Sequence, residues 1–168
     1  MQTPDAIAAL PKDQRGYPIP FFVYRPEDGA EPDLRIADVR TQRLCHLKRL
    51  CWVCGRKLGE TLAFIGGPKS VQQHVFVDYA MHLECAEFSM RTCPFLLGQS
   101  KRYAKAQRPS QAHAPAGMIL ERPEIMAIYL TRKYRTVEVG QDVLFRPGKA
   151  VAVKWFRDGQ PIERPGTL

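Results

Sequence analysis

The segment Cys51-Trp52-Val53-Cys54-Gly55, together with His82-Leu83-Glu84-Cys85 further along the chain, decides the fold. Each segment offers two metal-binding side chains separated by two residues: two thiols in the first, an imidazole and a thiol in the second. Three thiolates and one imidazole in this paired spacing are typical of a closed, tetrahedral structural zinc site. We therefore predict one structural Zn²⁺ ion bound by Cys51, Cys54, His82 and Cys85. The alternative, buried free cysteines beside a solvated histidine, leaves the spacing of four donors to coincidence.

The order of the two pairs predicts a treble-clef-like module, in which a Cys-x-x-Cys knuckle is followed by a β-hairpin and then by a helix. Residues three positions apart on a helix point the same way, so His82 and Cys85 can face one ion from its first turn. The 27 residues between Cys54 and His82 leave room for two strands and a turn. Gly55 suits the tight backbone of the knuckle. The two basic residues that follow it would offset the charge of the thiolates.

The residues before the knuckle are expected to form an irregular arm and then a helix. Residues 1–37 are rich in proline and acidic side chains, which indicates an extended N-terminal arm, with a short edge strand expected at Pro20–Tyr24. The pattern over residues 38–50 predicts a helix with Asp38 as its N-cap. Four apolar residues are expected near one face of this helix: Val39, Leu44, Leu47 and Leu50.

Between the two ligand pairs we expect a strand at residues 61–65, a turn at 66–68 and a second strand at 71–79, where apolar residues alternate. A helix over residues 82–92 is expected to end near Pro94, because proline disfavours helix at the residue before it. Residues 38–97 together form the predicted zinc module.

The last third of the chain is predicted to be β-rich. Residues 98–117 are basic and poor in large apolar side chains, which indicates an exposed linker. Strands are expected within residues 125–131, 135–139, 143–146 and 151–156, and Asp158-Gly159 is a strong turn signal. We therefore predict an α+β fold, in which residues 118–168 form an antiparallel β-rich part packed on the zinc module.

Composition bounds the class of protein. The chain has 168 residues, of which 45% are hydrophobic, so one ordinary domain with a core is expected. No apolar run is long enough to span a bilayer, and the start of the chain has no secretory-signal pattern. The cysteine count of five is odd, and metal binding explains three of the thiols. A reducing, cytoplasmic compartment therefore fits better than a disulfide framework.

The net charge of +8 comes largely from two basic stretches, one around the Cys51–Cys54 pair and one directly after the zinc module. Residues 41–60 and 98–113 each carry a net charge of +4. Such a distribution can attract DNA or RNA through phosphate contacts, whereas the plainer alternative is a basic, soluble surface. The candidate nucleic-acid-binding residues are Arg43, Lys48, Arg49, Arg56, Lys57, Lys101, Arg102, Lys105 and Arg108.

Other candidate chemistry is incomplete. Treble-clef modules also occur in HNH-type nucleases, for which His74 would be the general base and Asp78 a ligand of a catalytic ion. His82 is already assigned to zinc, and the helix after it contains no asparagine or second histidine. We therefore expect no catalytic residues. Cys45 and Cys93 are expected to serve in packing rather than as ligands.

Several segments resemble an uncharacterised family of phage-encoded and actinobacterial proteins, described at most as zinc-binding phage proteins. The matching segments are Arg15–Pro18, Pro20–Val23, Leu50–Gly55, Ala63–Ile65 with Gly67-Pro68, His82-x-x-Cys85-Ala86-Glu87 and Cys93–Leu96. The chain departs from the family pattern between Lys69 and Met81. The resemblance implies a phage or mobile-element setting, the host-cell cytoplasm as the location, and the same four ligands. It implies no activity.

Three functions remain open at this point. The first is a non-catalytic zinc-binding protein of phage type that associates with nucleic acid. The second is a protein–protein adaptor, or an inhibitor of a host defence machine, with Phe21–Tyr24 or the late β-sheet as its contact surface. The third is a metal-dependent, HNH-like nuclease.

Overall fold

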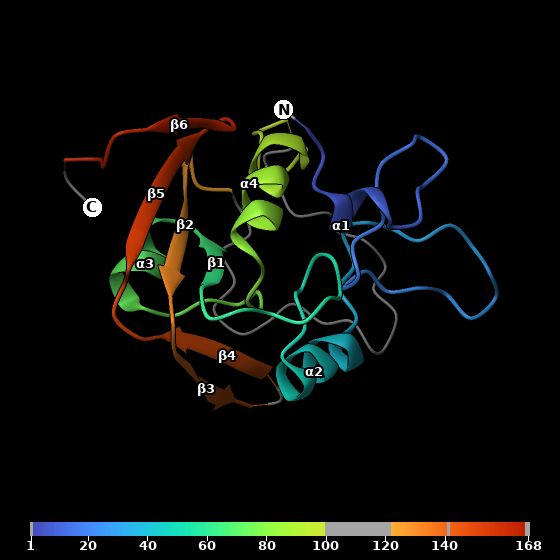
Figure 1. Ribbon diagram of the computed structural model, residues 1–168, viewed down its shortest axis with the longest axis horizontal. Helices are drawn as coiled ribbons and strands as arrows, with labels where there is room; N and C mark the ends of the chain where they lie inside the picture. The colour runs from blue at the N-terminus through green and yellow to red at the C-terminus, as the bar shows by residue number, and fades with distance from the viewer. Residues whose placement is uncertain (1, 100–121, 141, 167–168) are drawn as a thin grey trace.

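The computed structural model describes residues 2–99, 122–140 and 142–166 and combines helices with antiparallel strands (Figure 1). The helices are α1 (Asp5–Ala8), α2 (Val39–Lys48), α3 (Pro68–Gln73) and α4 (Leu83–Thr92). The strands are β1 (Leu62–Gly66), β2 (Ile125–Thr131), β3 (Tyr134–Val139), β4 (Asp142–Pro147), β5 (Ala152–Arg157) and β6 (Gln160–Ile162). The predicted α+β class is confirmed.

The main sheet has four antiparallel strands in the order β1-β2-β5-β6. Strand β1, which lies between the two ligand pairs in the sequence, pairs with β2 from Leu62 opposite Thr131 to Gly66 opposite Ala127. Strands β1 and β2 are almost continuously apolar and buried, as expected for strands covered on both faces. The residues around the ligand pairs and the C-terminal strands therefore share one sheet.

Strands β3 and β4 form a separate two-stranded hairpin. The hairpin is tied to the segment after α3 because Phe76 and Phe145 exchange two backbone hydrogen bonds, of 2.9 and 2.8 Å. Both phenyl rings are fully buried. The ring of Phe76 packs with that of Phe64, and the ring of Phe145 packs with those of Phe64 and Tyr79. This aromatic cluster fixes the hairpin against β1.

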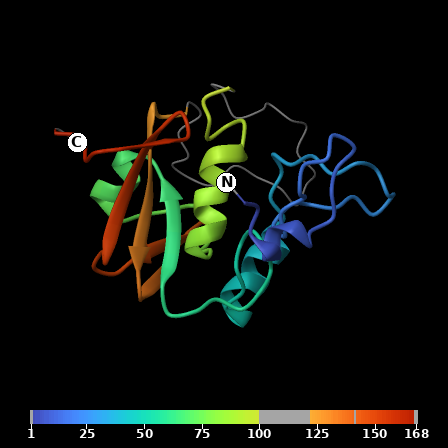
Figure 2. The same ribbon diagram turned by 45° about the horizontal axis from the view of Figure 1, so that its top comes forward.

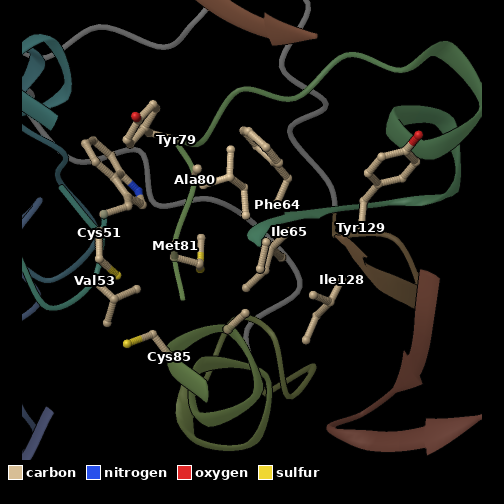
Figure 3. Packing of buried hydrophobic residues seen from close by; sticks show 14 of the residues in the cluster. Cys51, Val53, Phe64, Ile65, Tyr79, Ala80, Met81, Cys85, Ile128 and Tyr129 are labelled. Carbon is tan, nitrogen blue, oxygen red and sulfur yellow. The ribbon is translucent and has the colours of Figure 1, made fainter. Parts of the chain in front are cut away.

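Helix α4 covers one face of the main sheet and lies between that sheet and the N-terminal arm (Figure 2). Its buried side chains are Cys85, Ala86 and Met90. Figure 3 shows Cys85 at the edge of a core that continues through Met81 to Phe64 in β1. Among the described residues, no helix is both long enough and apolar enough to cross a membrane.

The helix boundaries predicted from capping signals are confirmed. The Asp38 carboxylate accepts a hydrogen bond of 2.8 Å from the Arg40 N–H and caps α2, although the helix ends at Lys48 because Arg49 is left-handed, with φ of 51°. Helix α4 ends at Thr92, with Cys93 in extended conformation before Pro94. Local side-chain and backbone preferences thus set these ends.

The predicted apolar face of α2 is wrong. Leu47 is 78% exposed and Leu44 is 40% exposed, whereas Cys45 is the fully buried residue of this helix. The helix is short and packs through one narrow side, and Gln42 on it donates to the Val77 carbonyl oxygen at 3.1 Å. A count of apolar residues could not identify that side.

The strand predicted at residues 71–79 is also wrong. Residues 68–73 form α3, because Pro68 occupies the first helical position, where its missing N–H costs nothing. His74 then ends the helix in a left-handed conformation with φ of 53°. Of the strand predicted at residues 71–79, a single bridge at Phe76 remains. Of the edge strand predicted at Pro20–Tyr24, a single bridge at Val23 remains. Most of the predicted linker at 98–117 lies outside the described residues.

The predicted Asp158-Gly159 turn joins β5 to β6, and both residues have positive φ, of 48° and 78°. A methyl group at Gly159 would lie 3.0 Å from the Met90 carbonyl oxygen and would also clash with Leu97. We predict that Gly159→Ala lowers the free energy of unfolding by about 3 kcal/mol, the sum of backbone strain and overpacking.

Gly140 provides the matched control, since its φ is 62° and a methyl group there meets no atom within 4 Å. Gly140→Ala should lower the free energy of unfolding by only about 1 kcal/mol, which is the cost of the backbone strain alone. Chemical denaturation of both variants measures the difference. Equal losses would show that close packing of this turn on α4 contributes nothing.

Candidate metal centre

The four predicted ligands come from two elements that the fold brings together. Cys51 and Cys54 lie in the loop between α2 and β1, whereas His82 is the N-cap of α4 and Cys85 lies in its first turn. One side-chain donor atom from each residue lies within 4.8 Å of all the others. Figure 3 shows Cys51 and Cys85 from these two elements close together at the edge of the core.

Backbone hydrogen bonds shape the loop that presents the first two thiols. The Gly55 N–H donates to the Cys51 carbonyl oxygen at 2.9 Å, and the Cys51 N–H donates to the Arg56 carbonyl oxygen at 2.7 Å. Gly55 has φ of 71°, and a methyl group there would lie 2.8 Å from the ring of Phe21. Only glycine can adopt this positive φ and also leave room for the Phe21 ring without strain. This confirms the role assigned to Gly55 from the sequence.

The start of α4 is positioned by backbone contacts with β1 and with the knuckle. Met81 and Ala63 exchange two hydrogen bonds of 2.9 Å, so the residue before His82 is held at the free edge of β1. The Trp52 N–H also donates to the Ala80 carbonyl oxygen at 3.1 Å. Both ligand pairs are therefore tied by backbone hydrogen bonds to the same segment, Ala80-Met81.

The imidazole of His82 is oriented for metal binding. Its Nε2 lies 2.9 Å from the Lys57 carbonyl oxygen. Because a carbonyl can only accept, Nε2 carries the proton and Nδ1 presents a lone pair. Nδ1 lies 3.4 Å from the Cys54 sulfur and 3.9 Å from the Cys85 sulfur. A backbone carbonyl that fixes the tautomer of a ligating histidine is a common outer contact of metal sites.

The three ligand thiols are buried, and hydrogen bonds among them shift their pKa values in different directions. Hydrogen bonds from Cys51 and Cys85 lower the pKa of the Cys54 thiol, whereas hydrogen bonding to Cys51 and Cys54, with burial, raises the pKa of Cys85. The N–H of His82 also donates to the Cys51 sulfur at 3.4 Å. Hydrogen bonding therefore favours one thiolate over its neighbours, and a bound cation would favour the deprotonated form of all three.

The remaining described cysteines stand apart from this group. Cys45 is fully buried, and burial, with the nearby Cys51 and Cys54, raises the pKa of its thiol to about 12. Cys93 is partly buried at the end of α4. Neither belongs to a cluster of potential ligands among the described residues.

Five of the predicted nucleic-acid-binding residues surround the knuckle, and all five are exposed: Arg43, Lys48, Arg49, Arg56 and Lys57. The end of α2 and the knuckle are joined because the Leu58 N–H donates to the Arg49 carbonyl oxygen at 2.8 Å and Leu50 forms a bridge with Lys57. The other four candidates, Lys101, Arg102, Lys105 and Arg108, lie outside the described residues.

The residues considered for a nuclease site do not gather around a second ion. His74 is exposed, and its Nδ1 lies 3.2 Å from the Tyr129 hydroxyl. Asp78 is exposed as well. Within the described ranges, the knuckle and α4 supply the one group of three or more histidine, cysteine or acidic side chains that could hold a metal.

Sequence reasoning found the four donors but missed the Lys57 carbonyl, because a backbone group leaves no mark in the sequence. Sequence reasoning also missed the pairing of Met81 with Ala63. Met81 lies in no strand, so no strand pattern marks it as a partner for the edge of β1. The arrangement as a whole can hold one metal ion with three sulfurs and one nitrogen.

We predict that Cys85→Ala abolishes stoichiometric metal binding and lowers the free energy of unfolding by at least about 3 kcal/mol, because a structural ion contributes directly to folding. Metal analysis of the purified protein and thermal denaturation test this.

Cys45→Ala is the control, since it removes an equally buried thiol that lies outside the ligand group. It should retain one equivalent of metal and lose only about 1 kcal/mol of stability. If both variants kept their metal, or if both lost it, the assignment of ligands would be wrong.

Comparison of the chain with protein-family models, with curated proteins and with solved structures gives no match. The assignment of this centre therefore rests on the spacing and geometry of its four donors.

Proposed function

We propose that the chain is a non-catalytic, zinc-stabilised protein that binds nucleic acid through the basic surface around its knuckle. The proposal combines three parts: the identity of the metal, the type of module, and the partner.

Zinc is the ion that suits the donors best. Tetrahedral bonds of about 2.3 Å to sulfur and about 2.0 Å to nitrogen place neighbouring S and N donors roughly 3.5 Å apart. The separations of His82 Nδ1 from the sulfurs of Cys54 and Cys85, 3.4 and 3.9 Å, lie on either side of that value. Three soft sulfurs and one imidazole favour Zn²⁺ over Mg²⁺ or Ca²⁺, which prefer oxygen. A complete set of four protein ligands leaves no position for a reactive water, which suits a structural role.

The order of elements supports a treble-clef-like module. The knuckle is followed by β1, which pairs with Met81 in an abbreviated hairpin, and then by α4, whose first turn carries two ligands. Helix α3 occupies the place where a simple turn would join the two strands of that hairpin.

Unpaired positive charge around the knuckle is the observation that carries the proposed partner. Among the described residues, none of the five cations Arg43, Lys48, Arg49, Arg56 and Lys57 forms an ion pair with a described acidic group. By contrast, three arginines earlier in the chain, Arg15, Arg35 and Arg40, are each paired with an aspartate two residues before them. A surface whose cations lack internal partners can neutralise phosphates and release their counterions.

The setting proposed for this binding is a reducing cytoplasm, in which the thiols stay available for zinc. The resemblance of the cysteine segments to zinc-binding phage proteins supports a host-cell location for a phage or mobile-element product.

One observation favours a protein partner as a second candidate. Leu47 and Leu44 are exposed at 78% and 40% on α2, one turn apart and between the cations Arg43 and Lys48. An exposed leucine pair in a basic helix is also a typical feature of a helix that docks on another protein. The control variant described below removes this leucine pair.

We predict that the wild-type protein binds DNA or RNA with an affinity that falls steeply with added salt. The quadruple variant Lys48→Gln/Arg49→Gln/Arg56→Gln/Lys57→Gln should weaken binding and reduce the slope of log K against log[salt] by about 0.7 to 0.9 for each phosphate that the variant no longer neutralises. Fluorescence anisotropy with labelled oligonucleotides, measured at several salt concentrations, gives both values.

The control is Leu44→Ser/Leu47→Ser on the same helix, which should leave nucleic-acid binding unchanged. Salt-independent binding, or no binding of any DNA or RNA by the wild type, would contradict the proposal. A loss in the leucine variant that matched the loss in the cation variant would show that the surface of α2 as a whole, rather than its charge, carries the binding.

A further inference from the structure

The β3–β4 hairpin carries a second group of exposed cations, which the sequence analysis did not single out. Five basic residues lie on its strands and on the loops that flank them, and all are exposed: Arg132, Lys133, Arg135, Arg146 and Lys149. The same stretch contains two acidic residues, Glu138 and Asp142, and both lie at the opposite, turn end of the hairpin.

Two of these arginines are placed against each other. Arg135 and Arg146 are direct partners across the two strands. Because side chains alternate along a strand, both lie on the face opposite the buried ring of Phe145. Like charges directly opposite each other destabilise a strand pair. Neither arginine has an ion pair with an acidic residue in the described part of the chain.

The loops at the base of the hairpin hold the neighbouring lysines in fixed positions. The hydroxyl of Thr131, which is 1% exposed, lies 3.1 Å from the carbonyl oxygens of both Lys133 and Lys149. The Gly148 N–H donates to the Lys133 carbonyl oxygen at 2.7 Å. A buried polar group that ties two loops holds the backbone at both lysines in place, so little backbone entropy is lost there when a partner binds.

A chain of hydrogen bonds attaches the hairpin to α2, the helix that carries part of the basic surface at the knuckle. The Tyr134 hydroxyl at the start of β3 lies 2.8 Å from Nδ1 of His46 in α2 and 2.8 Å from the buried hydroxyl of Tyr79. Figure 1 shows the hairpin and α2 beside each other at one end of the molecule. The two groups of cations therefore belong to neighbouring, firmly connected elements.

The chemistry of the hairpin selects among nucleic acids. Proteins that hold single strands stack exposed aromatic rings on the bases. Tyr17, in the N-terminal arm, is the one aromatic side chain among the exposed large apolar residues that the structure describes. A surface of cations without aromatic rings recognises charge density, which is about twice as high along a duplex as along a single strand.

We propose that the outer face of the β3–β4 hairpin is a second phosphate-binding surface, and that with the knuckle cations it binds the backbone of a double-stranded nucleic acid without reading its sequence. This inference rests on the function proposed above, because it names the form of nucleic acid and adds a second contact.

The test uses Arg135→Gln/Arg146→Gln in the full-length, metal-loaded protein. Anisotropy is measured with a DNA duplex, an RNA duplex and the single strands of the same sequence. We expect the variant to bind duplex about 10-fold more weakly near 0.1 M salt, with a salt slope that is smaller by about 2, as for two phosphates that are no longer neutralised. Thermal denaturation should show no loss of stability, since the substitutions remove a repulsion between like charges.

The control is Arg157→Gln/Arg164→Gln, which removes the same charge near β6, at the far end of the molecule from the hairpin (Figure 1). It should leave duplex affinity within about 2-fold of the wild type. Equal losses in the two variants, tighter binding of single strands than of duplexes, or undiminished binding by Arg135→Gln/Arg146→Gln would overturn the inference.

The outcomes separate this inference from the proposed function. Binding that is lost in the knuckle variant but kept in the hairpin variant overturns the inference and leaves the function standing. A wild-type protein that binds no nucleic acid overturns both. A preference between the DNA and RNA duplexes identifies the natural form.

Discussion

The structure depends on the closure of the knuckle onto the first turn of α4. Four donor atoms from Cys51, Cys54, His82 and Cys85 meet within 4.8 Å, although the two pairs are separated by 27 residues. Backbone hydrogen bonds bring the pairs together, and hydrogen bonding among the crowded thiols lowers the pKa of Cys54 while it raises the pKa of Cys51 and Cys85. One cation bound by all four donors would allow three thiolates to coexist in this buried site.

The rest of the molecule is arranged around this closure. Strand β1 holds the residue before His82 on one edge and pairs with β2 on the other, so the centre is continuous with the C-terminal sheet. The N-terminal arm covers the knuckle, where the ring of Phe22 stacks on Trp52 at 4.9 Å. The exposed cations of the knuckle and of the β3–β4 hairpin then stand on a rigid frame.

Much of the site, and part of the fold, could be predicted from the sequence. The four donors were found because their spacing is local and their chemistry is specific, and Asp38 and Pro94 marked helix ends through purely local preferences. The prediction failed where tertiary contacts decide. Alternating apolar residues at 71–79 indicated a strand, yet Pro68 begins a helix there. Leu47 was expected on an apolar face of the helix at residues 38–50 and is largely exposed. The cations of the hairpin were overlooked because strand pairing, not sequence distance, brings Arg135 to Arg146.

X-ray absorption spectroscopy of the metal in the purified protein would show directly whether the four donors hold zinc. We predict a zinc edge and a first shell of three sulfurs at about 2.3 Å with one nitrogen at about 2.0 Å. A first shell of oxygen and nitrogen alone, or a folded protein that contains no metal, would contradict it.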